Sequence, residues 1–192
     1  GKTLSQQASS GWQKWFVRLF EEVRTLIEMR QKTIINSLDE LLAQNEVPAA
    51  AVWPAANLAF FIPFTVYDTV TVKRLLVPLS VAVGNIDVGI YDANKILLVS
   101  SGSVSSIAAQ VQALNITNRV LAPGRYYMAM VAASAALQPF RLAGTLRNRT
   151  FGIFERTSSL PLPATAVFTD NATRSYVPEF ALDTKGGQIT PW

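Results

Sequence analysis

The sequence predicts a mainly β protein: an antiparallel, jelly-roll-like β-sandwich preceded by a long N-terminal α-helix. Two patterns lead to this prediction. From residue 58 onward, short apolar runs recur at roughly ten-residue spacing between turn residues, which is typical of a sandwich. Before Pro48, apolar residues recur at three- and four-residue steps without an intervening proline, which indicates a helix. We therefore divide the chain into a helix (1–47), a Pro/Ala linker (48–57), a sandwich (58–157) and an extended C-terminal segment (158–192) that packs on the sandwich or on a neighbouring subunit.

Composition excludes several kinds of chemistry. The 192 residues include no His and no Cys, so disulfides, thiolate nucleophiles, His bases and the usual zinc sites are excluded. No apolar run approaches the ~20 residues of a membrane-spanning helix. Hydrophobic residues make up 49% of the chain and charged residues only 16%. Such a sparsely charged surface suggests that some apolar area is buried against a partner.

Residues 11–44 are predicted to form one helix with a heptad repeat, capped by Ser9 or Ser10. We expect self-association through its apolar seam, as a parallel coiled coil; the core positions assigned to this contact are Val23, Ile27, Ile34 and Leu41. Arg30 and Ser37 also fall in core positions, where polar residues set register or oligomer number. In the alternative interpretation, the helix folds back over the sandwich as an amphipathic cover.

The first helical turns are unusually rich in large apolar side chains. These are Trp12, Trp15, Phe16, Leu19 and Phe20. Aromatic anchors of this kind dominate binding in grooves on other proteins, so we predict a partner anchor here. Two alternatives are that they cap a helical bundle or lie at a membrane interface. The interfacial helix is disfavoured because the polar face lacks an excess of Lys and Arg.

After the proline-containing linker, apolar runs and turn residues predict a series of strands. We expect them at residues 58–64, 70–79, 85–91, 96–101, 110–116, 125–132 and 138–143, with further strands at 150–155, 165–168 and 174–180. Residues 105–113 could form a short helix, but the serines before them favour a loop that leads into a strand.

Two of these strands have informative patterns of burial. In strand 85–91, alternation places Ile86, Val88 and Ile90 in the core and leaves Asn85, Asp87 and Tyr91 outside. Strand 125–132 is apolar on both faces and is therefore expected to be covered on both. Its second cover would be a neighbouring subunit or the C-terminal segment.

Four segments together resemble a β-sandwich module of tailed-bacteriophage virion proteins, over about residues 57–142. They are Thr69-Val70-Thr71-Val72-Lys73-Arg74-Leu75, Gly84-Asn85-Ile86-Asp87-Val88-Gly89-Ile90-Tyr91-Asp92, Leu98-Val99-Ser100-Ser101-Gly102-Ser103 and Leu121-Ala122-Pro123-Gly124-Arg125-Tyr126-Tyr127-Met128-Ala129. The resemblance implies a structural virion component, such as a fibre, spike, tail, neck or head-decoration protein. It also implies a homo-oligomer, with a trimer favoured, and contacts with other virion proteins through the N-terminal helix.

Acidic residues in the sandwich do not form a catalytic pattern. Asp87 and Asp92 fall on opposite faces of a regular strand, which argues against the paired carboxylates of a glycoside hydrolase. Asp92 and Asn94 are interpreted as turn formers, with a calcium site as the alternative. We therefore predict no catalytic residues, no metal and no cofactor.

Basic and aromatic residues alternate in the later part of the chain, as in proteins that bind single-stranded nucleic acid. They are Arg141, Arg147, Arg149, Phe151, Phe154 and Arg156. The favoured interpretation is a solvated strand edge or a subunit contact, because charges on edges block unwanted pairing. No nucleic-acid partner is therefore predicted.

Aromatic residues expected at the surface offer a second function, the binding of a host-surface glycan. Trp53 and Tyr91 are the candidate glycan contacts, with Tyr67 and Trp192 as further aromatics. The sequence thus favours a non-enzymatic virion structural protein, with a carbohydrate-binding or host-adhesion module as the alternative. A carboxylate-based hydrolase ranks third.

Overall fold

The computed structural model describes residues 34–36, 49–108, 110–143, 154–157, 160–170 and 176–184. The chain divides into two units, Gly1–Thr33 and Ile34–Trp192, and all described residues belong to the second. The five anchor residues, and the self-association residues Val23, Ile27 and Leu41, lie outside the described residues. Their predicted roles stay predictions.

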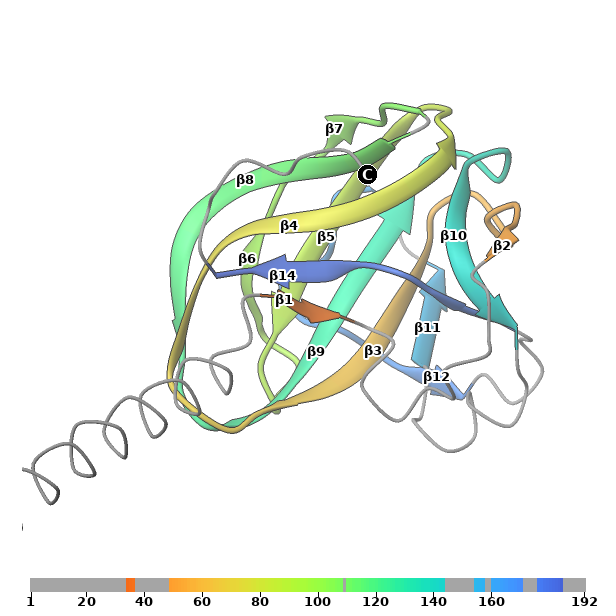
Figure 1. Ribbon diagram of the computed structural model, residues 1–192. Helices are drawn as coiled ribbons and strands as arrows, with labels where there is room; N and C mark the ends of the chain where they lie inside the picture. The colour runs from red at the N-terminus through yellow and green to blue at the C-terminus, as the bar shows by residue number, and fades with distance from the viewer. Residues whose placement is uncertain are drawn as a thin grey trace, which may run out of the picture. The chain divides into compact units, whose positions relative to one another are not determined.

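The described residues form two antiparallel sheets (Figure 1), which confirms the mainly β sandwich. Sheet 1 has the order β1 (Ile34–Asn36), β14 (Ala181–Asp183), β4 (Val70–Val81), β10 (Gln138–Ala143) and β13 (Tyr176–Pro178), with β2 (Ala49–Ala50) beside β10 and β8 (Gln110–Leu121) beside β4. Sheet 2 has the order β12 (Thr169–Asp170), β11 (Phe154–Thr157), β3 (Leu58–Val66), β9 (Gly124–Ala132), β5 (Asn85–Tyr91) and β6 (Leu97–Ser100), with β7 (Val104–Ser105) also beside β5.

A two-stranded ribbon links the two sheets. In sheet 2, β3 pairs with β9 as far as Val66 opposite Gly124. In sheet 1, β4 pairs with β8 from Val70 opposite Leu121. Both arms of the ribbon therefore cross from one sheet to the other at the same end of the sandwich, which is the lower end in Figure 1.

Several strand boundaries match the predictions, and one strand is notably longer. β5 and β10 have the predicted bounds. β8 was expected to end at Ile116 but continues to Leu121. Its turn-like residues 116–118 form a bulge instead, because Arg119 pairs with Val72 and Asn115 pairs with Arg74. The serine-rich stretch before β8 contains β7 and no helix in its described residues, as the sequence favoured.

The predicted helix over residues 11–44 is wrong at residues 34–36. Ile34 belongs to β1, where it pairs with Asp183 of β14, and Ile35 and Asn36 pair with the next two residues of that strand. Two consecutive β-branched side chains suit a strand better than a helix. Ile34 is therefore not a core position of a helical seam.

The core between the sheets is apolar and includes Trp53. The indole N–H of Trp53 donates to the Leu58 carbonyl at 2.9 Å, and the ring packs edge-on against Phe60 at 4.9 Å. Trp53 is only 1% exposed, so its assignment as an exposed glycan contact is wrong. The cause is that the segment before β3 is fastened to the sandwich, where the backbone N–H of Trp53 donates to the carbonyl of Leu137.

The outer face of sheet 2 has its own apolar cover, formed by residues 160–168, which we call the strap. The strap residues Leu162 and Ala166 are buried against β3, β5 and β9. The sheet residues beneath are Ala59, Phe61, Tyr91, Tyr127, Ala129 and Val131. The prediction that the strand ending at Ala132 is covered on both faces is thus confirmed. The cover belongs to the C-terminal part of the same chain.

Gly89 of β5 lies close to both the strap and β6. A Cβ atom built there would lie 2.9 Å from the Val99 carbonyl oxygen and 3.0 Å from both a Leu162 methyl and the Ser100 Cβ. We expect Gly89→Ala to lower the free energy of unfolding by about 1–3 kcal/mol, because the backbone of β6 must move. Chemical denaturation measures this. Gly124→Ala is the control, since its added Cβ meets nothing closer than 3.6 Å; equal losses in the two variants would contradict the close packing.

Candidate functional site

Asp87 is a buried carboxylate beneath the strap. Its Oδ2 atom accepts a hydrogen bond from the Leu162 backbone N–H at 2.9 Å and a long one from the Ser100 hydroxyl at 3.5 Å. Its Oδ1 atom accepts from the Ser101 hydroxyl at 3.2 Å. The prediction that Asp87 lies outside is wrong, because the strap covers this face and leaves the residue 0% exposed.

The environment of Asp87 makes its ionised form less favourable than in water. Burial raises the pKa of its carboxyl above the usual 3.8, while the bonds from Leu162, Ser101, Ser100 and Gly102 act in the opposite direction. Burial outweighs these bonds. The strap is thus fastened to β5 by a carboxylate that gains a proton more readily than an exposed one.

Tyr91 provides a second side-chain fastening for the strap. Its hydroxyl donates to the Pro163 carbonyl at 2.6 Å, and its ring packs edge-on against Phe61 at 5.3 Å. Burial raises the pKa of Tyr91, so the hydroxyl keeps its proton and remains a donor. Tyr91 is 0% exposed. Its assignment as an exposed glycan contact is therefore wrong for the same reason as the placement of Asp87.

The turn between β5 and β6 binds the strap through backbone atoms. Leu97 N–H donates to the Ala164 carbonyl at 2.9 Å, and Ala166 N–H donates to the Lys95 carbonyl at 2.8 Å. Asp92 shapes this turn, since its carboxylate accepts from the Ile96 N–H at 2.9 Å. The interpretation of Asp92 as a turn former is confirmed.

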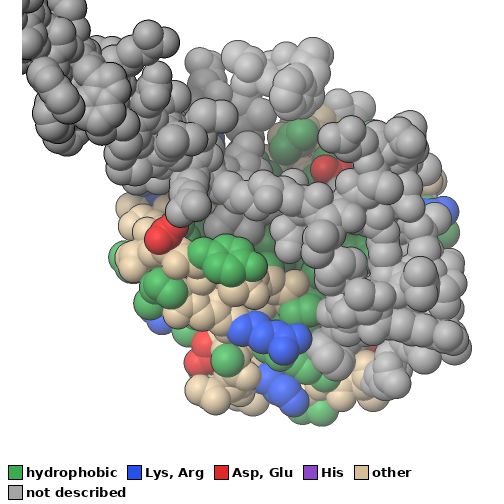
Figure 2. Space-filling model, turned by 60° about the horizontal axis from the view of Figure 1, so that its bottom comes forward, with side chains coloured by type: hydrophobic (Ala, Val, Ile, Leu, Met, Phe, Trp, Pro, Cys, Tyr) green, Lys and Arg blue, Asp and Glu red, His purple; other side chains and the backbone are tan. Residues whose placement is uncertain are grey.

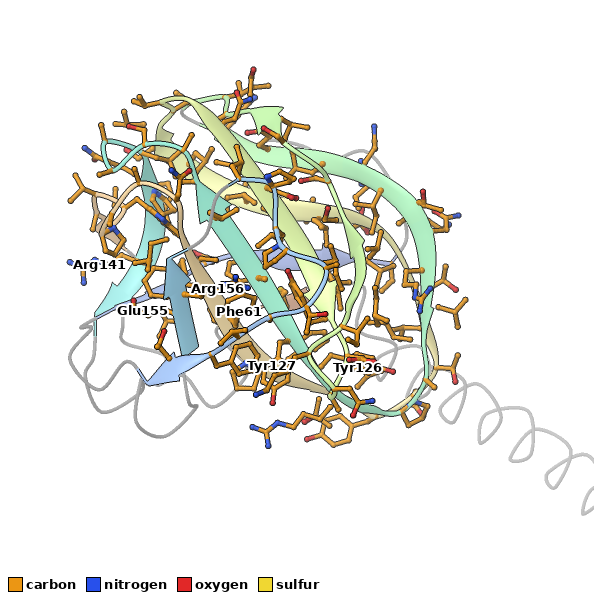
Figure 3. All side chains as sticks on the ribbon, turned by 180° about the vertical axis from the view of Figure 1, so that it is seen from behind. Phe61, Tyr126, Tyr127, Arg141, Glu155 and Arg156 are labelled. Atoms are coloured by element: carbon orange, nitrogen blue, oxygen red, sulfur yellow. The ribbon has the colours of Figure 1, made fainter. Side chains whose placement is uncertain are left out.

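Aromatic and basic side chains meet near the end of the strap. The Phe168 ring packs against Phe61 at 4.9 Å and against Tyr127 at 4.8 Å. Lys95 Nζ lies 4.7 Å from the Phe168 ring centre, and the Arg125 guanidinium lies 5.8 Å from that of Tyr127. These distances fit cation–π contacts. Figure 3 shows Phe61 and Tyr127 on this face, and Figure 2 shows basic next to hydrophobic side chains on the lower surface.

The predicted basic patch is divided between the two sheets where it can be described. Arg141 belongs to β10 of sheet 1, whereas Arg156 belongs to β11 of sheet 2 and donates to the Thr165 carbonyl at 3.3 Å. Arg147, Arg149 and Phe151 lie outside the described residues. Arg156 thus serves as another fastening of the strap, which the interpretation as a solvated edge did not include.

A part-buried ion pair joins two neighbouring strands of sheet 1. Arg74 of β4 donates from Nε to Asp183 of β14 at 2.8 Å and also contacts it through Nη2. Sequence reasoning missed this pair because 109 residues separate its members and no local pattern marks either one. Burial also raises the pKa of Glu179, which lies between β13 and β14.

Three polar side chains that could carry chemistry are bound to the fold itself. The oxygens of Asp87, Tyr91 and Asp183 all contact other parts of the sandwich or the strap. Across the described ranges, no three or more His, Cys, Asp or Glu side chains are grouped to hold a metal. None of the described residues belongs to a helix long and apolar enough to cross a bilayer. Comparison with known protein families, curated proteins and solved structures found no match.

We predict that Asp87→Asn loosens the strap and lowers the free energy of unfolding by about 1–3 kcal/mol at neutral pH. The carboxylate accepts three hydrogen bonds, whereas an amide replaces one of the two acceptor oxygens with an NH2 group, which can only donate. It should also change the dependence on pH. Between pH 3.8 and the raised pKa, the folded chain binds a proton at Asp87 that the unfolded chain does not. This carboxyl therefore adds stability as the pH falls through that window, and the contribution is lost as the pH rises through the raised pKa.

Urea denaturation at several pH values measures both effects. The difference in unfolding free energy between the natural chain and Asp87→Asn should grow as the pH falls through the window. Asp92→Asn is the matched control, since this carboxylate serves an exposed turn. A difference that stays constant from neutral pH to below 3.8 would contradict the effect of burial on Asp87.

Proposed function

We propose that this chain is a non-enzymatic structural protein of a bacteriophage particle, with its β-sandwich displayed by an N-terminal attachment segment. The observation that carries the proposal is the use of polar side chains to join segments of the fold. Asp87, Tyr91 and Arg156 hold the strap, and the ion pair of Arg74 and Asp183 holds β14. Polar side chains that fasten one segment to another suit a module that withstands assembly rather than one that turns over a substrate.

The connectivity of the sandwich supports the same proposal. The ribbon of β3–β4 and β8–β9, which bends from one sheet to the other, is the connection on which a jelly roll is built. Jelly rolls are common in viral capsid proteins. One fold can serve many functions, so the attachment role has its own test.

The attachment role is tested by changing Trp12 and Trp15 to Ala together. We expect at least about tenfold fewer copies of this chain per assembled particle, because two large anchors are lost from one contact. Quantitative mass spectrometry of purified particles measures the copy number. Tyr67→Ala is the control and should be incorporated normally. Normal incorporation of the double variant would contradict the proposed anchoring role of Trp12 and Trp15.

A host-adhesion role is the second candidate, and one observation favours it. Tyr67, in the turn between β3 and β4, is 82% exposed at the end of the sandwich. An exposed tyrosine offers a flat apolar ring with a polar tip, which suits contact with a sugar.

The adhesion role is tested on a glycan array with the full chain. We expect Tyr67→Ala to weaken binding at least about tenfold, because the exposed ring is the contact surface. Tyr91→Phe is the control, since it changes a buried hydroxyl and leaves the surface intact. If no glycan binds, or if Tyr67→Ala binds as well as the natural chain, the adhesion role is rejected and only the structural role stands.

A further inference from the structure

Nearly every edge of the two described sheets ends in a very short strand. β1, β2, β6, β7, β12 and β13 have between two and four residues each. Short edge strands are a common protection against pairing with other chains. β6 is protected further, because Leu97 at its start bonds to Ala164 of the strap.

β8 is the exception among these edges. It has 12 residues and pairs with β4 on one side. The backbone hydrogen bonds found for β8 in the described part of the chain all run to β4. Backbone groups of alternate residues in an antiparallel strand point to opposite sides, so the second edge of β8 carries N–H and C=O groups that no described strand pairs with.

The composition of β8 lacks the residues that usually protect a long edge. It contains no Lys and no Pro, and Arg119 is its one charged residue. The bulge at residues 116–118 is the remaining protective feature. It leaves residues 110–115 as a regular, uncharged run beside it, and Gln110, Ala113 and Asn115 within that run are exposed.

We propose that residues 110–115 of β8 form an interface with β8 of a second copy of this chain, by antiparallel addition of one edge to the other. A two-fold axis is the commonest symmetry of protein oligomers, and an antiparallel strand pair fits it directly. Charge permits the pairing, because no ionised side chain in the run faces its own copy. The interface extends sheet 1 across two subunits. It is independent of the N-terminal attachment role.

The interface is tested by placing lysines along it. In the full chain, the triple change Gln110→Lys, Ala113→Lys and Asn115→Lys brings like charges together around the axis in any register. We expect the dissociation constant measured by analytical ultracentrifugation to rise at least about tenfold. The control carries the same added charge in exposed turns, through Thr69→Lys, Ala93→Lys and Ala135→Lys, and should associate as the natural chain does.

Amide hydrogen exchange gives a second measurement that needs no substitution. Amides of residues 110–115 should exchange more slowly as the concentration of the natural chain rises, whereas association through the N-terminal segment would leave them unchanged. Exchange at β8 that does not depend on concentration would overturn the proposal. Equal dissociation constants for the two lysine variants would overturn it as well. The Trp12 and Trp15 variant keeps β8 intact, so failure of the attachment role is distinguishable from failure of this interface.

Discussion

The burial of both faces of β9 is the constraint on which much of this structure depends. One face of this strand belongs to the core between the sheets, and the other carries Tyr127, Ala129 and Val131. Leaving that second face in water would expose a wide apolar surface, so a further layer is required. The strap provides it, and the polar groups of β5 become buried as a consequence. Gly89 is then needed because the strap and β6 approach the same point of β5.

Apolar contact is only part of what holds the strap. Leu162 and Ala166 are buried against the sheet, and the strap backbone carries peptide groups that must find partners once they are covered. Asp87 and Tyr91 bond to two consecutive strap residues, Leu162 and Pro163. Such bonds add modest net stability, but each becomes costly to break once buried. They therefore determine where the strap lies along β5, a function that apolar side chains could not perform with the same precision of register.

Local sequence patterns predicted the features that depend on neighbours in the chain. The alternation in β5, and the apolar runs and turn residues that predicted β10, were sufficient to place those strands. The same alternation failed for Asp87 and Tyr91, because the cover that buries Asp87 comes from 75 residues away. Trp53 was misjudged for a related reason. The prolines around it predicted a linker, whereas the pairing of β2 with β10 draws that segment onto the sandwich. Ile34 shows that a heptad pattern can coincide with a strand when an edge such as β14 is available.

The apolar face of a sheet and its edge strands need different kinds of cover, and the described residues cover the outer face of sheet 2 but not the β8 edge of sheet 1. Strap residues cover the exposed face of sheet 2, and their backbone also binds the start of β6. The described C-terminal residues of sheet 1 are used differently, since β14 pairs with β4 on the side opposite to β8. The ribbon strands β8 and β9 therefore occupy different positions in their sheets. Among the described strands, β9 has a partner on both sides, whereas β8 pairs with β4 alone. The same ribbon thus gives sheet 2 its central strand and gives sheet 1 a long edge strand.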